Sequence, residues 1–258
     1  MSTILYPSPV FGPIHSRRLG ISLGINLLPE GGKLCSFDCV YCECGFNADH
    51  RPHRPLPTPQ MVEESLRVEL AKLTRRNIKP DVLTFAGNGE PTLHPKFPEI
   101  VDRVIAVRDE LCPNAKVSIL SNATQIVRPE IRAALLKFDN NILKLDTVDS
   151  DYIHKVDRPQ GHYEVETIID ELCKFEGHLI IQTMFMKGTL NGESVDNTGN
   201  EFVLPYLEAL KRINPHQVMI YTLDRETPAH HLEKASHEEL DKIADKIRSL
   251  GIECSVSY

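Results

Sequence analysis

From about residue 20 onward, short runs of apolar and β-branched residues alternate with longer segments whose apolar positions recur at helical spacing. Short apolar runs are typical of buried strands, and the 3.6-residue period is typical of helices that cover a sheet. The alternation therefore predicts six strand-helix units around a parallel sheet. The predicted strands are Gly20 to Leu28, Asp81 to Ala86, Lys116 to Leu120, Ile142 to Asp146, Leu179 to Met186 and Gln217 to Leu223. The helices that follow them are Pro59 to Arg76, Phe97 to Leu111, Pro129 to Phe138, Tyr163 to Phe175, Phe202 to Arg212 and His237 to Leu250.

Several predicted helix ends carry local signals. Thr58 precedes Pro59, and Ser236 precedes two glutamates, so both serve as N-caps. Gly177 and Gly251 follow two predicted helices, where a residue in the left-handed region commonly ends a helix. These signals support the helix positions independently of the periodicity.

Six units predict an α/β fold of the partial TIM-barrel type, (β/α)6, because a closed barrel needs eight. The parallel sheet then stays open on one side, which leaves room for a bulky substrate. An ordinary doubly wound open sheet is the alternative fold. The 258 residues are expected to form one domain, with 1–19 as an N-terminal extension, 20–251 as the barrel and 252–258 as a short C-terminal edge strand.

The composition narrows the class of protein. Hydrophobic content of 41% and charged content of 25% are ordinary for a folded globular chain. The N-terminus lacks a basic segment followed by an apolar one, and no stretch approaches the roughly 18 apolar residues of a membrane span. A cytoplasmic protein without membrane contact is therefore expected. The net charge of -7 argues against a surface that coats nucleic acid, although a local basic patch remains compatible with RNA.

Three of the seven cysteines lie within eight residues, in the run Cys-Ser-Phe-Asp-Cys-Val-Tyr-Cys. Cys35, Cys39 and Cys42 supply three thiolates, whereas a closed zinc site takes four protein ligands and a complete iron-sulfur site usually takes four thiolates. An odd number of cysteines, three of them clustered, fits a reducing compartment and an open metal site better than a disulfide framework.

Other polar and glycine-rich residues follow the predicted strands. The run Gly-Asn-Gly-Glu-Pro follows the second strand, Ser121 and Asn122 follow the third, Asp146 ends the fourth, and Thr222 to Arg225 follow the sixth. Parallel strands bring their carboxyl ends to one edge of the sheet, so these residues are expected to share a site there. Taken alone, the glycine-rich run is a turn and Ser121-Asn122 is a cap or turn.

Together these motifs, Cys-x3-Cys-x-aromatic-Cys, Gly-x-Gly-Glu-Pro and Ser-Asn, resemble the radical S-adenosylmethionine (SAM) superfamily over almost the whole chain. The resemblance implies a radical SAM enzyme with one 4Fe-4S cluster on Cys35, Cys39 and Cys42. Its open iron binds the amino and carboxylate groups of S-adenosyl-L-methionine. An electron from a one-electron reductant such as flavodoxin or ferredoxin then cleaves SAM to methionine and a 5'-deoxyadenosyl radical, which abstracts a substrate hydrogen.

The resemblance also implies positions for SAM. Tyr41 is expected near the adenine, and Ser121 or Asn122 near the ribose. The methionyl amine is expected to meet a segment of four residues, which are Gly87, Asn88, Gly89 and Glu90.

Four charged residues have both a structural and a functional interpretation. Lys144 and Asp146 share one face of a predicted strand, where they either form a structural pair or contact SAM or substrate. Arg158, like Arg225, either binds the SAM carboxylate or an anionic substrate, or forms a surface ion pair.

Two stretches, Ser16 to Asn26 and Cys35 to Glu43, more closely resemble the branch with wyosine-base synthases, which modify tRNA. Those synthases carry a second cluster on additional N-terminal cysteines, but no cysteine precedes Cys35 here. No auxiliary cluster is therefore expected. Cys44 is either a proton donor, a substrate-linked thiol or a spectator, and Cys112 and Cys173 are expected to be packing residues.

The resemblance leaves several substrates open. RNA modification is the first hypothesis, and activation of a glycyl-radical protein or modification of a peptide is the second. A small-molecule rearrangement is a further alternative, and a non-enzymatic iron-sulfur or zinc binding module is the alternative from a different class. The basic segment His50 to Arg54, like Arg17-Arg18, either holds phosphate near the site or is an ordinary solvated segment.

Overall fold

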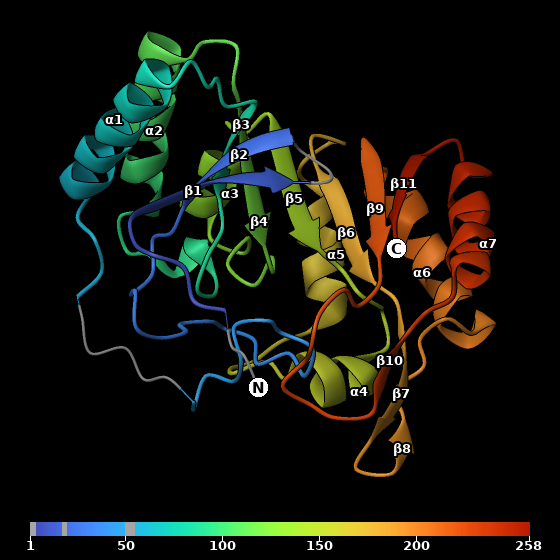
Figure 1. Ribbon diagram of the computed structural model, residues 1–258. Coiled ribbons are helices and arrows are strands. Elements are labelled where there is room, and N and C mark those ends of the chain that lie inside the picture. The colour runs from blue at the N-terminus through green and yellow to red at the C-terminus, as the bar shows by residue number, and fades with distance from the viewer. Residues whose placement is uncertain (1–3, 17–19, 50–54) are drawn as a thin grey trace.

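An eight-stranded sheet forms the centre of the computed structural model, which describes residues 4–16, 20–49 and 55–258 (Figure 1). The strand order is β1-β2-β3-β4-β5-β6-β9-β11. Every pair from β2 to β11 is parallel, and β1 alone is antiparallel to its neighbour β2. No pairing between β1 and β11 occurs in the described part of the chain, so the predicted open partial barrel is confirmed. The strands are β1 (Val10–Ser16), β2 (Gly20–Ile25), β3 (Val82–Phe85), β4 (Lys116–Ser121), β5 (Asn140–Lys144), β6 (Ile180–Met184), β9 (Gln217–Tyr221) and β11 (Glu253–Ser257).

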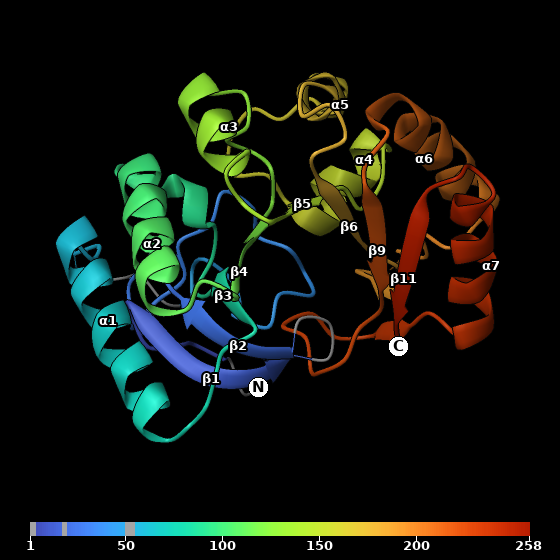
Figure 2. The same ribbon diagram turned by 90° about the horizontal axis from the view of Figure 1, so that it is seen from above.

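Six helices line the outer face of the curved sheet (Figure 2). They are α1 (Pro59–Arg75), α2 (Phe97–Leu111), α3 (Pro129–Leu135), α5 (Val165–Cys173), α6 (Asn200–Ile213) and α7 (His237–Arg248). Each buries one apolar stripe against the strands, which explains why a strand such as β3 is buried along its whole length. All six predicted helices are present, with ends that differ by a few residues from the prediction.

The helix ends follow the local signals. Thr58 accepts a hydrogen bond from the backbone N–H of Met61 at the start of α1. Ser236 and Glu239 form a reciprocal capping box at the start of α7. Gly177 and Gly251 adopt φ values of +86° and +81° after α5 and α7.

The two ends of the chain meet the sheet at opposite edges. The segment before residue 20, expected as an extension, contributes β1 to one edge. The last residues form β11, which pairs with β9 in parallel from Glu253 opposite Gln217, as the sequence predicts for a seventh strand. The gap in the sheet therefore lies between an antiparallel strand and a parallel one.

Several short elements follow the carboxyl ends of the strands and were not predicted. A second sheet in the order β10-β7-β8 comprises β7 (Met186–Leu190), β8 (Glu193–Ser194) and β10 (Leu232–Lys234). The predicted strand Leu179 to Met186 is too long, because β6 ends at Met184 and a separate strand, β7, begins at Met186. Phe185 lies between them, and its N–H donates to the Tyr221 carbonyl. The apolar sequence continues across this break, so the sequence does not show where β6 ends.

A short helical segment lies beside this second sheet in Figure 1, at the same end of the molecule as the cysteine-bearing loop. It comprises α4 (Ser150–Tyr152) and a π-helical turn, η2 (Ile153–Asp157). A 3-10 turn, η1 (Pro91–Leu93), follows β3. No helix among the described residues is long and apolar enough to cross a membrane.

Candidate functional site

The three clustered cysteines lie in the loop after β2, and the segment Lys33 to Asn47 is called the cluster loop below. Leu34 forms an isolated β-bridge with Gly89, in which the Leu34 N–H donates to the Asn88 carbonyl at 2.9 Å. The Glu90 N–H donates back to the Leu34 carbonyl at 3.0 Å. A Cβ at Gly89 would lie 2.0 Å from the Leu34 oxygen, and φ there is +128°, so this approach requires glycine. The second motif therefore fixes the backbone immediately before Cys35.

Cys35, Cys39 and Cys42 are free thiols on partly buried residues. Within the described residues, no three His, Cys, Asp or Glu side chains gather as ligands of one metal ion. In a cubane cluster each thiolate binds a different iron, so a cluster does not require such convergence, whereas a zinc ion does. Three thiolates are a donor set that suits a 4Fe-4S cluster with one iron left open to another ligand.

The three thiols have different electrostatic surroundings. Burial raises the pKa of Cys35 to about 12 and raises that of Cys39 well above its ordinary value. A hydrogen bond with Cys44, followed by the charge of Lys33, lowers the pKa of Cys42 to about 6 despite burial. A thiol must lose its proton to bind iron, and of these three thiols Cys42 has the surroundings that most favour the ionised form.

Lys33 was missed by the sequence reasoning and lies buried inside the cluster loop. Its ammonium donates to the Gly45 carbonyl at 2.7 Å and to Asp38 Oδ1 at 3.3 Å. Burial alone would lower the pKa of Lys33, but the neighbouring thiols, Cys42 first among them, and Asp38 hold it above its ordinary value. The only signal in the sequence is a lysine two residues before the first cysteine, which does not differ from a surface lysine.

Glu90 joins the loops after β3 and β4. It accepts hydrogen bonds from the Thr92 N–H at 3.0 Å, the Ser121 hydroxyl at 2.9 Å and the Asn122 N–H at 2.6 Å. Burial raises the pKa of Glu90, and these hydrogen bonds oppose the rise. The expected contact of Glu90 with the methionyl amine stays a prediction. In the structure, the Glu90 carboxylate fixes the loop after β3 to the loop after β4.

Asn122 links this pair of loops to the cluster loop. Its side-chain amide donates to Ser36 Oγ at 3.0 Å and lies 3.5 Å from the Cys35 sulfur. Asn88 instead reaches the N-terminal segment, with Nδ2 2.9 Å from both the Tyr6 and the Pro29 carbonyls. Neither contact tests the positions expected for the ribose and the amine of SAM, and both explain the burial of these amides.

Lys144 and Asp146 form the ion pair that strand alternation suggested, and two further residues join it. Tyr41 OH hydrogen-bonds to Asp146 and Lys144, and Asp157 Oδ1 lies 3.0 Å from Lys144 Nζ. These four residues are called the ionic network below. Burial raises the pKa of Asp157 to about 7, against the opposing charge of Lys144. Asp157 was missed because only the π-helical turn η2 brings it to the end of β5.

A cavity of about 500 Å³ opens beside the cluster loop. Tyr41, Cys42, Cys44 and Gly87 border it on the side of the loop. The remaining wall comes from the inner face of the sheet and from the loop after β9, and includes His15, Ser22, Thr84, Leu120, Ile142, Gln182, Met184, Met219, Tyr221, Asp224 and Arg225. Residues of β1 and β11 both contribute to the wall, so the cavity lies across the open side of the barrel.

Most of the other predicted site residues do not border this cavity. Glu90, Ser121, Asn122, Lys144 and Asp146 make the contacts with one another and with neighbouring loops that are given above.

Of the two predicted arginines, Arg225 borders the cavity and Arg158 does not. Arg158 packs its guanidinium over the Phe46 ring of the cluster loop at 5.4 Å. Arg225 pairs with Glu43 at 2.7 Å, so the loop after β9 contacts the cluster loop across the cavity. The basic residues Arg17, Arg18 and His50 to Arg54 lie outside the described residues.

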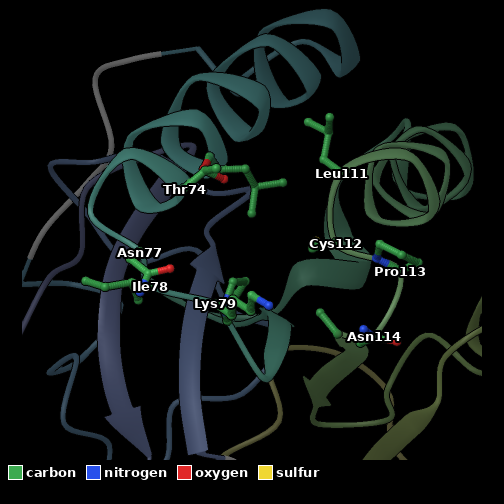
Figure 3. A pocket seen from close by; sticks show the side chains of 11 residues that line it. Thr74, Asn77, Ile78, Lys79, Leu111, Cys112, Pro113 and Asn114 are labelled. Atoms are coloured by element: carbon green, nitrogen blue, oxygen red, sulfur yellow. The ribbon is translucent and has the colours of Figure 1, made fainter.

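A second cavity, of about 280 Å³, lies at the other end of the strands, between the C-terminal ends of α1 and α2 (Figure 3). Thr74, Lys79, Cys112 and Asn114 are among the residues that border it. Cys112 also packs against the main hydrophobic core, as does Cys173, in agreement with their expected packing roles. None of the predicted site residues borders this cavity.

Comparison with known proteins places the chain in a family. The model of the radical SAM superfamily matches residues 30–201. UPF0026 protein MJ1312 of Methanocaldococcus jannaschii is 32% identical over 238 residues, which cover 90% of this chain and 69% of that protein. A UPF0026 protein of Helicobacter pylori is 32% identical over 243 residues, covering 90% and 71%. The chain belongs to the radical SAM superfamily, as its motifs predict.

Solved structures share the fold at low sequence identity. A radical SAM methyltransferase from Sphaerobacter thermophilus has a TM-score of 0.66 and 15% identity, over 92% of this chain and 66% of that one. SuiB of Streptococcus suis, bound to S-adenosylmethionine, has a TM-score of 0.65 and 14% identity, over 90% and 50%. Archaeal TYW1 has a TM-score of 0.54 and 16% identity, over 88% and 71%. These likenesses show a common architecture, while substrate chemistry must be argued from the site.

Proposed function

We propose that this protein is a radical SAM enzyme in which Cys35, Cys39 and Cys42 hold one 4Fe-4S cluster beside a SAM-binding cavity. When bound, the cluster supplies the electron that cleaves S-adenosyl-L-methionine reductively to methionine and a 5'-deoxyadenosyl radical. The observation that carries the proposal is the bridge between Leu34 and Gly89, which joins the cysteine loop to the glycine-rich motif at the edge of a 500 Å³ cavity.

The protein's own residues prepare this site before any cofactor binds. Glu90 holds the loops after β3 and β4 together, and Asn122 ties them to Cys35 and Ser36. Tyr41 borders the cavity while its hydroxyl is held by the ionic network, which fixes the ring for contact with the adenine. Pre-organisation of this kind lowers the entropic cost of binding SAM.

The substrate proposed for this enzyme is a large molecule that reaches the cavity from the open side of the barrel. Residues from both edge strands line that side, for example His15 of β1 and Ser257 of β11. RNA remains the first candidate and a polypeptide the second. Support for RNA rests on Arg17, Arg18, Arg51 and Arg54, outside the described residues, and support for a polypeptide comes from SuiB, a structural neighbour solved with its precursor peptide.

Anaerobic reconstitution tests the proposal. Native protein supplied with iron, sulfide, dithionite and SAM is expected to show a 4Fe-4S spectrum and to release 5'-deoxyadenosine. The Cys42→Ala variant should release none, and Cys173→Ala, which changes a partly buried cysteine of α5, should match native protein. A native protein without a cluster spectrum and without 5'-deoxyadenosine would contradict the proposal.

The two candidate substrates are separated by a binding experiment. RNA that co-purifies with native protein and is lost on changing Arg51 and Arg54 would support RNA. A protein partner retained after nuclease treatment would support a polypeptide. Deuterium transfer from the captured substrate into 5'-deoxyadenosine then identifies the hydrogen that is abstracted.

A further inference from the structure

Lys33 is a buried cation inside the loop that carries the three cysteines. Its side chain is 1% exposed, so water does not solvate the ammonium. Two hydrogen bonds are made within the loop, to the Gly45 carbonyl at 2.7 Å and to Asp38 Oδ1 at 3.3 Å. A buried charge in this position is costly unless nearby negative charge compensates it.

The compensation supplied by protein carboxylates is incomplete. Asp38 is the carboxylate in contact with Lys33, its distance of 3.3 Å is long for a charge-assisted bond, and its Oδ1 also accepts from the Asn47 N–H at 2.7 Å. Lys144 at the end of β5, whose side chain is 13% exposed, contacts two carboxylates, Asp146 and Asp157. The surroundings of Lys33 therefore fit a cation whose further counter-charge is the group held by the cysteines.

A cation close to an iron-sulfur cluster affects how easily the cluster is reduced. A 4Fe-4S core bound by three thiolates carries net negative charge, and reduction adds one more negative charge. The potential of such a centre is set by net charge, by hydrogen bonds to sulfur and by exposure to solvent. A cation fixed in a water-poor loop favours the more negative, reduced state, because the interaction is screened little there.

We propose that Lys33 is a positioning residue that makes the cluster easier to reduce, through its buried ammonium inside the cluster loop. The inference rests on the proposed function, because it requires a cluster on Cys35, Cys39 and Cys42. Reduction takes one electron from an external donor, which is dithionite in the test below. No bond is formed or broken, and Lys33 keeps its proton throughout.

The test is a redox titration of the reconstituted cluster without SAM, monitored by the electron paramagnetic resonance of the reduced form. In Lys33→Met the ratio of reduced to oxidised cluster at a fixed potential should fall by about tenfold or more, and tenfold corresponds to about 59 mV for a one-electron couple. Lys33→Arg keeps the charge and should stay within about threefold of native protein. Lys155→Met, which removes a half-exposed lysine paired with Glu193, is the matched control and should leave the ratio unchanged.

Asp38→Asn provides a second test with the opposite sign. It removes the carboxylate that partly neutralises Lys33, so the reduced-to-oxidised ratio should rise. A purely structural role for Lys33 does not produce opposite shifts in these two variants at equal iron content.

The outcomes separate the inference from the proposed function. Unchanged ratios in both Lys33→Met and Asp38→Asn, at native iron content, would overturn the role of Lys33. If Lys33→Met does not take up iron, the Asp38→Asn variant decides, with a raised ratio supporting the role and an unchanged ratio overturning it. Absence of any cluster in native protein contradicts the proposed function instead.

Discussion

The cluster loop and the ionic network each bury a lysine at the same end of the barrel, but they compensate its charge differently. Lys144 lies between Asp146 and Asp157, so its positive charge is balanced by the protein itself. Lys33 has Asp38 at 3.3 Å and the Gly45 carbonyl at 2.7 Å, with no second carboxylate in contact among the described residues. The difference is that carboxylates of the protein surround Lys144 on two sides and Lys33 on one.

The two regions are nevertheless joined. Tyr41 belongs to both, since it lies in the cluster loop and hydrogen-bonds to Asp146 within the network. The Asp38 N–H donates to the Asp157 carbonyl at 2.9 Å, and the Val40 N–H donates to the Val156 carbonyl at 2.9 Å. Changes in the network should therefore affect the fold first, and changes in the cluster loop should affect the chemistry first.

The largest expected effect comes from removing one cluster ligand. Cys39→Ala should lower the rate of 5'-deoxyadenosine release at least about hundredfold, because a site with two thiolates no longer holds the cluster. The free energy of unfolding of the iron-free protein should change by no more than about 2 kcal/mol, the cost of trimming a partly buried side chain. Activity assays and urea unfolding measure the two quantities. A cluster spectrum and activity that both survive the change would remove Cys39 from the ligand set.

The next effect tests the network. Lys144→Met leaves two buried carboxylates without their cation and should lower the free energy of unfolding by about 3–5 kcal/mol. Lys33→Met in iron-free protein should lower the free energy of unfolding by less, about 1–3 kcal/mol, because Asp38 is more accessible to water than Asp146 and Asp157. Urea unfolding of both variants makes the comparison directly.

A compensating variant serves as the control for this pair. Asp157→Asn added to Lys144→Met removes one of the stranded charges and should recover part of the loss. Equal costs at Lys144 and Lys33 would show that the two lysines are compensated alike, and the contrast drawn above would be wrong.

A smaller effect tests the bridge between the cluster loop and the glycine-rich motif. Gly89→Ala introduces a Cβ 2.0 Å from the Leu34 carbonyl oxygen at a φ of +128°, and should destabilise the fold by about 2–3 kcal/mol. Iron content after reconstitution should fall as well, because the backbone before Cys35 must move. Gly192→Ala is the matched control, since its φ is +84° but no atom lies within 4 Å. If the two variants lose equal stability and both load iron fully, the close approach at Gly89 has no special role.

The sequence and the structure agree best where the signal is local. The helix α7 illustrates this, since Ser236 and Glu239 predict a cap and the structure shows the reciprocal hydrogen bonds. The six predicted strands are also present, and they pair in parallel. Their apolar runs were a usable signal because strands of a parallel sheet are buried on both faces. Agreement is poorer at the second sheet, where the apolar run from β6 into β7 continues across a break in pairing.

The smallest expected effect concerns the cap of α7, formed by Ser236 and Glu239. It lies far along the chain from Lys33 and Lys144, so it serves as a reference for an ordinary surface interaction. Hydrogen bonds from Lys187 and from Ser236 lower the pKa of Glu239 to about 2. The ionised form therefore stabilises the folded chain at pH values above its ordinary pKa of 4.5, and the contribution is lost as the pH falls from there toward 2. Glu239→Gln should cost about 1 kcal/mol at pH 7 and much less near pH 2.

Unfolding of native and Glu239→Gln proteins across this pH range measures the difference. Glu238→Gln, which changes a neighbouring glutamate paired with Lys242 on the same helix, is the control. A difference in stability that stays constant from pH 7 to pH 2 would show that ionisation of Glu239 does not matter to the cap.

The sequence by itself determined the class of protein. The order of strands and helices predicted an open (β/α)6 barrel, and the cysteine spacing, the glycine-rich motif and Ser-Asn carried the resemblance to the radical SAM superfamily. Residue types at a fixed spacing were sufficient, because ligand chemistry and helix or strand periodicity depend on neighbours along the chain.

Only the tertiary structure decided how charge is distributed around the site. Asp157 reaches Lys144 through a π-helical turn, Asn122 reaches Cys35 across 87 residues, and Lys33 is buried because the loop folds around it. Burial and the distance between charges depend on segments that are remote in the sequence, so no local pattern reports them. The physical reason is that the cost of a buried charge is set by everything packed around it in three dimensions.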